Sequence, residues 1–174
     1  MARGQKLMLK KLSYITFGLV LAFLGYAIFL DARSQIYLWT PVSNVFNAHV
    51  VVPDYNLGDN PQVQYDRTIN QEFVGDFTVK LMDVKTGISE CYGEGRGFHY
   101  DPNTPVIVNN DTLDTLDWYM NSDCSHNPNV TTGQHFLETT WTIHREGLPD
   151  KYFSVDSNIF NIYPTGTKPA LTSK

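Results

Sequence analysis

The sequence predicts an all-β sandwich of about seven strands, preceded by one N-terminal transmembrane helix. Three observations predict it: an uncharged apolar stretch near the N-terminus, an alternation of apolar and polar residues beyond residue 48, and a single pair of cysteines. A chain of 174 residues with such a stretch set aside has room for one domain of ordinary size.

The apolar stretch runs from Leu12 to Leu30 without a charged residue. As an α-helix with a rise of ~1.5 Å per residue it would be roughly 28 Å long, close to the ~30 Å hydrocarbon core of a bilayer. A helix bonds its own backbone polar groups, so it can cross a membrane as a single segment. We therefore predict a transmembrane signal-anchor helix over 12–30, which reaches residue 39 if the helix continues past Asp31.

The residues that precede this stretch include four bases, Arg3, Lys6, Lys10 and Lys11. They predict a cytoplasmic tail over 1–11, an inner (plasma) membrane location, and a periplasmic or extracellular domain. A cleavable signal peptide has the same order of basic and apolar residues and would export the domain equally. A retained anchor is favoured, because the stretch exceeds a usual signal-peptide core and no clear A-x-A site follows it.

The exported part is acidic. All 18 Asp and Glu residues lie from Asp31 onward, together with only nine of the 13 Lys and Arg residues. Because such a surface repels phosphate groups, a nucleic acid is not an expected partner.

The two cysteines, Cys91 and Cys124, both fall in the exported part. In an oxidising compartment such a pair is most simply a disulfide. Closing a loop of this size stabilises a fold by roughly 3 to 4 kcal/mol in the chain-entropy model. A redox-active cysteine is disfavoured because the sequence has no C-x-x-C motif.

The alternation is clearest from Val63 to Leu81, where odd positions are mostly apolar and even positions mostly polar. This pattern predicts strands with one buried face and one wet face. A single strand of that length would span about 60 Å, beyond ordinary strands, so it has to bend or break. We place the break at the polar run 70–72, or at Gly75 as a bulge.

Further strands are predicted between turns rich in Gly, Pro, Asn and Asp: 48–52, one that carries Cys91, 105–109, 115–120, 134–144 and 151–163. Gly93, Gly95 and Gly97 lack the lysine and following helix of a phosphate-binding loop, so we interpret them as a loop or irregular strand. The predicted organisation is a juxtamembrane linker over 31–47, the sandwich over 48–164 and a disordered tail over 165–174.

Candidate metal ligands are few. Asp111, Asp114 and Asp117 gather carboxylates that could bind Ca²⁺, but their spacing is not that of an EF-hand loop and a solvated acidic loop is favoured. The five histidines show no paired zinc-ligand spacing. No metal, no cofactor and no catalytic residue is predicted, since no nucleophile elbow or spaced carboxylate pair is present.

Arg67 occupies one of the mostly apolar odd positions of its predicted strand, between Tyr65 and Ile69. An ion-paired or snorkelling structural arginine is the favoured interpretation, and a ligand-binding arginine is the alternative. Trp118 and Trp141 join Arg67 as candidate interaction or structural residues.

Two segments resemble the last strands of immunoglobulin-like or fibronectin-III-like domains: 131–143, with Gly133-Gln134-His135 and Trp141-Thr142-Ile143, and 157–162, Ser-Asn-Ile-Phe-Asn-Ile. His135 stands where those domains have a corner tyrosine. The resemblance implies an immunoglobulin-like β-sandwich.

Most of the exported part is also similar to small uncharacterised proteins encoded by bacteriophages and prophages. The matching residues include Tyr65-Asp66-Arg67-Thr68-Ile69, Phe73-x-Gly75-x-Phe77, Leu116-Asp117-Trp118 and both cysteines. This resemblance implies an N-terminal anchor joined to a short β domain, and no assigned activity.

The sequence therefore predicts a non-enzymatic, membrane-anchored interaction module outside the cytoplasm that binds a protein or envelope partner. A membrane-anchored envelope hydrolase is the alternative, and a structural component of a virion is a further one. The sequence leaves the partner and the oligomeric state open.

Overall fold

The computed structural model describes residues 2–103 and 114–167. These fall into two compact units, one ending at Thr40 and one beginning at Pro41.

The first unit is the helix α1, Ala2–Trp39. Within its segment Tyr14–Trp39, a stretch of 18 residues reaches a mean hydropathy of 2.0, so the segment is long and apolar enough to cross a membrane. The helix continues through Asp31 and Arg33 without a break. Residues 31–39, which the sequence left open between a linker and an extension of the helix, therefore belong to the helix. A short 3-10 helix, η1, follows at Val42–Asn44.

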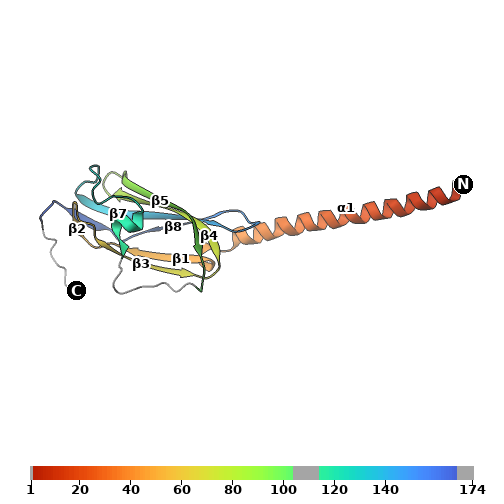
Figure 1. The fold of residues 1–174 in the computed structure, drawn as a ribbon, viewed down its shortest axis with the longest axis horizontal. Coiled ribbons are helices and arrows are strands. Elements are labelled where there is room, and N and C mark those ends of the chain that lie inside the picture. The colour runs from red at the N-terminus through yellow and green to blue at the C-terminus, as the bar shows by residue number, and fades with distance from the viewer. Residues whose placement is uncertain (1, 104–113, 168–174) are drawn as a thin grey trace. The chain divides into compact units, whose positions relative to one another are not determined.

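The second unit is mostly β, with two sheets (Figure 1). The smaller sheet has β3 at its centre, paired antiparallel with both neighbours; its strands are β1 (Phe46–Val51), β3 (Gln62–Ile69) and β6 (Asp114–Thr115). The larger sheet has the order β2-β9-β7-β4-β5, with β8 also paired to β7; its strands are β2 (Tyr55–Asn56), β4 (Phe73–Asp83), β5 (Ser89–Tyr100), β7 (Gly133–His144), β8 (Lys151–Asp156) and β9 (Phe160–Tyr163).

The long strand β7 shapes the larger sheet. Residues 133–135 pair with β9, whereas residues 138–143 pair with β8. One edge is thus shared by two strands, and the sheet curls into a half-barrel rather than forming one flat layer of a sandwich. The expected mostly β domain is confirmed, whereas the finer expectation of an immunoglobulin-like sandwich is not confirmed, because the larger sheet is curled.

Phe46 of β1 shows how the smaller sheet packs onto the larger one. Its ring centroid lies 5.1 to 5.7 Å from those of four aromatic side chains: Phe73, Tyr100, Trp141 and Phe153. These four residues come from β4, β5, β7 and β8, so a single buried ring joins β1 to the concave face of the half-barrel. Aromatic rings at these separations stabilise a core beyond the area that they bury.

The predicted break in the stretch 63–81 is confirmed. β3 ends at Ile69 and β4 begins at Phe73, so the polar run between them is a turn. The pairing of β4 with β5 also shifts register between Gly75 and Phe77, so a bulge is present as well.

The strand predicted at 115–120 is wrong, because this segment forms the helix α2, Leu116–Met120. The Thr115 hydroxyl accepts a hydrogen bond from the backbone N–H of Trp118, an N-cap that favours helix over strand. Asn121 then ends the helix in the left-handed conformation, with φ of 51°. The strand predicted at 105–109 lies outside the described residues.

The strand predicted at 151–163 is two strands, β8 and β9. Between them, the Ser157 hydroxyl accepts a hydrogen bond from the backbone N–H of Leu137, and the Asn158 side chain bonds to both polar backbone groups of Val52. These bonds hold the chain as it leaves the pairing with β8 and enters that with β9.

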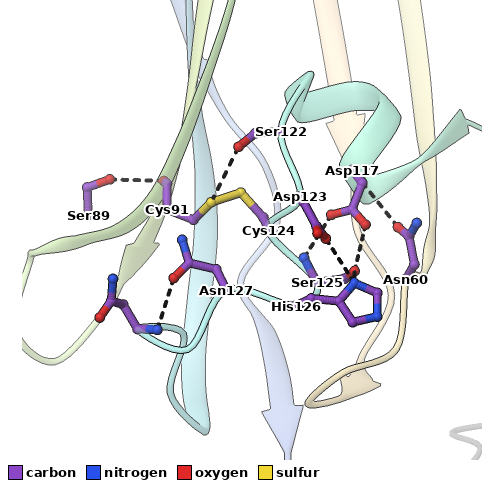
Figure 2. Close-up of a disulfide and its surroundings, with 11 residues drawn as sticks. Asn60, Ser89, Cys91, Asp117, Ser122, Asp123, Cys124, Ser125, His126 and Asn127 are labelled. Atoms are coloured by element: carbon purple, nitrogen blue, oxygen red, sulfur yellow. Dashed lines mark hydrogen bonds and ion pairs between the residues drawn. A yellow bond between two sulfur atoms is a disulfide. The ribbon is translucent and has the colours of Figure 1, made fainter.

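Cys91 and Cys124 form the predicted disulfide, with their Cα atoms 5.8 Å apart (Figure 2). The bond ties β5 to the loop that follows α2. Gly93 lies two residues beyond Cys91, and a Cβ there would lie 1.5 Å from the backbone oxygen of Met120. The glycine run therefore lies within β5 as an irregular strand, since the pairing with β4 shifts register between Gly95 and Phe98 and Gly97 has a positive φ of 69°. At Gly93 the missing side chain lets α2 approach the sheet.

Candidate functional site

A pocket of about 360 Å³ lies where β3, β4, β5, β7 and α2 meet. We call it the aromatic pocket; its lining residues are Tyr65, Arg67, Phe77, Phe98, Tyr100, Trp118, Tyr119, Asn121, Thr139 and Trp141. Seven of these ten residues are aromatic. Ligand sites of small molecules have this composition, a largely apolar lining with a few polar groups.

Strand periodicity places the lining residues in pairs. Tyr65 and Arg67 are two apart on β3, as are Phe98 and Tyr100 on β5, and Thr139 and Trp141 on β7. Residues two apart on a strand point to the same face of a sheet. Two of these pairs come from the half-barrel, and the third comes from β3 of the smaller sheet.

Gly95 makes room for part of the lining. It lies opposite Phe77 in the pairing of β5 with β4. A Cβ at this position would lie 2.4 Å from the Phe77 ring and 2.5 Å from the Phe98 ring. A glycine is required here so that both rings can reach the pocket.

The inner part of the aromatic pocket is buried and fixed by contacts. Trp141 is only 2% exposed, and its ring stacks with that of Tyr65 at a centroid distance of 6.4 Å. The Tyr119 hydroxyl shares a hydrogen bond of 2.9 Å with the Thr139 hydroxyl. Burial raises the pKa of Tyr119, so this hydroxyl stays neutral.

The rim of the aromatic pocket is exposed. Trp118 of α2 is 64% exposed and Phe98 of β5 is 47% exposed. Asn121 ties the end of α2 to β5, because its side-chain amide donates a hydrogen bond of 2.6 Å to the carbonyl oxygen of Glu94. The side chains of Trp118 and Phe98 therefore present two large apolar surfaces at the pocket entrance, and the Asn121 hydrogen bond fixes the end of α2 there.

Among the described lining residues, Arg67 is the only charged one. Its guanidinium carbon lies 5.8 Å from the ring centroid of Tyr65 and 5.5 Å from that of Tyr100, a cation–π arrangement. Its Nε is buried and has no hydrogen-bond partner among the described residues. Burial raises the pKa of Tyr100, while a hydrogen bond from Trp141 and the charge of Arg67 act in the opposite direction.

The three residues singled out from the sequence, Arg67, Trp118 and Trp141, therefore line one pocket. Sequence reasoning missed the other seven lining residues: Tyr65, Phe77, Phe98, Tyr100, Tyr119, Asn121 and Thr139. Tyr65 could have been predicted, because it lies two residues before Arg67 and therefore on the same face of the strand. Asn121 gave no signal, because its place depends on a helix that the pattern did not predict.

A second polar group, which we call the His135 cluster, is built from Asp83, Glu90, Thr131 and His135. His135 is fully buried, and its Nε2 lies 2.9 Å from a carboxylate oxygen of Glu90 and 4.0 Å from one of Asp83. Its Nδ1 lies 3.2 Å from the carbonyl oxygen of Gly133. Both ring nitrogens thus face acceptors.

The carboxylates of the His135 cluster have further partners. Burial alone would raise the pKa of Glu90, but hydrogen bonds from the Thr131 hydroxyl and backbone N–H, and from His135, lower it overall. Hydrogen bonds from Thr86 are the main cause that lowers the pKa of Asp83. The geometry would suit a divalent cation, yet these atoms already have protein partners, which is typical of a structural network.

A third polar group lies beside the disulfide (Figure 2). The Asp117 carboxylate accepts hydrogen bonds from the backbone N–H and the hydroxyl of Ser125, at 2.7 and 2.6 Å. The Ser125 hydroxyl also lies 2.8 Å from His126 Nδ1, and the same nitrogen lies 2.8 Å from Asp123. In a Ser-His-Asp relay the serine and the carboxylate contact opposite ring nitrogens, so this arrangement is not such a relay.

The calcium candidate residues do not come together in the described part of the chain. Asp111 and the side chain of Asp114 lie outside it. Asp117 holds the loop after α2 through Ser125, and with Asp123 and His126 it forms an exposed cluster of the kind that is common without an ion.

Comparison with protein-family models, with curated proteins and with solved structures finds no match to this chain. The function of this chain is therefore inferred from its own residues and their geometry.

Proposed function

We propose that this protein is a membrane-anchored binding module whose β domain lies outside the cytoplasm and takes a ligand into the aromatic pocket. The observation that carries the proposal is the pocket itself: a preformed cavity of about 360 Å³ that draws aromatic side chains from both sheets and α2. A concave apolar site with a few polar groups is the usual form of a ligand site.

The lining supports binding rather than catalysis. Its polar groups are one guanidinium, one amide, one threonine hydroxyl, three tyrosine hydroxyls and two indole N–H groups. Among the described residues, no His, Asp or Glu side chain lines the pocket to serve as a general acid or base. This composition favours a binding protein over the alternative of an envelope hydrolase.

The membrane location rests on α1 and on charge. The helix is long and apolar enough to span, and the bases that precede it favour a cytoplasmic N-terminus. The disulfide supports an oxidising compartment for the β domain, because such bonds are rare in the cytosol.

The setting that we propose is a bacteriophage or prophage protein in the inner membrane of a bacterium, with an immunoglobulin-like domain in the periplasm. The sequence resemblances support this setting, and the two-sheet β architecture is compatible with it. A phage-encoded module of this kind would contact the host envelope through the pocket face.

Location is tested on the full-length chain expressed in a bacterium. We expect the protein to stay in the membrane pellet after alkaline carbonate extraction. We also expect protease added to spheroplasts to digest the β domain and leave a fragment that contains α1. Full-length protein in the soluble fraction, or a β domain protected in intact spheroplasts, would contradict the proposal.

Use of the pocket is tested by photo-crosslinking in the same membranes. The photoreactive residue p-benzoylphenylalanine is placed at position 98, on the pocket rim, and at position 152, where Tyr152 is 66% exposed on β8. We expect a discrete adduct from position 98 that is absent from position 152. Identical adducts from both positions, or none from position 98, would argue against the pocket as the binding site.

A further inference from the structure

We infer that the aromatic pocket selects a small ring-shaped molecule that carries an oxyanion, a carboxylate or phosphate, which pairs with Arg67. The inference rests on the proposed function, since it names the ligand class of that pocket. Three features carry it: the unmatched charge of Arg67, the way its guanidinium is held, and the rings around it.

Arg67 differs from Lys80 and Arg96, two other cations of the β domain. Lys80 pairs with Glu138 at 3.1 Å, and Arg96 pairs with Glu94 at 3.2 Å. For Arg67, no ion pair with a carboxylate is found among the described residues, and its buried Nε has no hydrogen-bond partner. An unpaired buried donor costs free energy, which an acceptor brought by a ligand would recover.

The surroundings of Arg67 hold its guanidinium without consuming its hydrogen bonds. Tyr65 and Tyr100 approach the guanidinium carbon through their ring faces, at 5.8 and 5.5 Å. A cation–π contact uses the flat face of the group and leaves its N–H edges available. Two parallel N–H groups match the two oxygens of a carboxylate or phosphate, which gives both strength and orientation.

The other aromatic residues of the lining and the pocket volume indicate the shape and size of a ligand that would fit. Phe77, Phe98, Trp118 and Trp141 offer aromatic surfaces around the same cavity. Flat rings pack well in offset or edge contacts with such surfaces. A volume of about 360 Å³ is at the small end of ligand sites, which span ~300 to 1,000 Å³, so it suits one or two rings with a short acidic arm.

Two sources offer this chemistry, an aromatic acid and an acidic sugar, and matched probes distinguish them. Indole-3-propionate is compared with its neutral amide, and glucuronate with glucose. Binding to the full-length chain in detergent micelles is measured by isothermal titration calorimetry, with micelles alone as the blank. We expect at least one acid to bind at least tenfold more tightly than its neutral counterpart.

Arg67→Met tests the pairing directly. We expect it to lower the affinity for the acid to that of the neutral counterpart, with little change in affinity for the neutral compound. Arg96→Met is the matched control, because it removes the same charge from an exposed site outside the pocket; it should bind the acid as the wild type does. The thermal unfolding midpoint of each variant verifies the fold.

Three results would overturn the inference: equal affinity of the wild type for acid and neutral probes, a preference for the acid that survives Arg67→Met, or no binding of either acid. None of them would refute the proposed function, which depends on the adduct from position 98.

Discussion

The aromatic pocket and the His135 cluster both place a group that can carry positive charge on an otherwise apolar strand face, yet their surroundings differ. His135 has a protein acceptor at each ring nitrogen and is fully buried. Arg67 has ring faces beside it and a buried nitrogen without a partner. A satisfied buried network stabilises a fold, whereas an unsatisfied group in a cavity is typical of a site that awaits a ligand.

This difference distinguishes a region of the domain that contributes to stability from a region that is available for binding. The His135 cluster lies close to the disulfide, since Glu90 precedes Cys91 in β5. The aromatic pocket draws its rim from α2 and the far half of β5. Substitutions in the first region should therefore unfold the domain, and those in the second should change binding.

Removal of the disulfide should have the largest effect on stability. Replacing both Cys91 and Cys124 by Ala frees a loop with a sequence separation of 33, which should lower the free energy of unfolding by about 3 to 4 kcal/mol. Denaturant titration of the full-length protein in micelles measures the change. Addition of a reductant to the wild type should reproduce it and should leave the double variant unaffected.

His135→Ala should follow, with a loss of about 3 kcal/mol. The substitution leaves a cavity and removes a partner from a buried carboxylate. Arg67→Met is the comparison and should change the free energy of unfolding by less than about 1 kcal/mol, because no ion pair is broken. A loss for Arg67→Met as large as that for His135→Ala would contradict the distinction between the two regions.

The next largest effect on stability should come from acid, which protonates the carboxylates of the His135 cluster. The folded domain lowers the pKa of Glu90 from its ordinary value of 4.5 and also lowers that of Asp83. Carboxylates with lowered pKa values contribute stability that is fully present above about pH 4.5 and lost as pH falls through their folded pKa values. Unfolding midpoints measured from pH 7 to pH 3 should therefore decline below about pH 4.5.

Glu90→Gln sharpens this pH test. The variant should be less stable than the wild type at pH 7 and should lose less stability on acidification, because one of the linked carboxylates is gone. Glu146→Gln is the matched control at an exposed position, and its acid profile should follow the wild type. Parallel profiles for Glu90→Gln and the wild type would show that Glu90 does not contribute.

The smallest effect on stability should come from Trp118→Ala. Trp118 is 64% exposed, so the free energy of unfolding should change by less than about 0.5 kcal/mol. Binding of the acid probe should nevertheless weaken severalfold, since a stacking surface is lost from the rim. Tyr152→Ala, another exposed aromatic residue, should leave both quantities unchanged.

Local patterns determined much of the architecture. The absence of charge from Leu12 to Leu30 determined the apolar helix, because helix length and hydropathy depend only on nearby residues. The alternation through Val63 to Leu81 determined two strands, and the polar run between them determined their separation. With only two cysteines in the sequence, one disulfide could form.

Local sequence patterns did not predict the helix α2 or the curl of the larger sheet. A helix of five residues has too few positions for a helical period to be recognised, and it depends on the Thr115 cap and on packing across Gly93. The curl of the sheet depends on β7 pairing first with β9 and then with β8. Pairing between distant segments does not leave a local signal in any one of them.

The sequence by itself determined that Arg67 lies on an apolar strand face and that Trp118 and Trp141 are large aromatic residues outside the helix. Only the tertiary structure decided that all three share one pocket, because they come from β3, α2 and β7. It also decided their roles, since burial and partners are properties of the packed chain: Trp141 is enclosed, Trp118 stands at the rim, and Arg67 faces rings instead of a carboxylate.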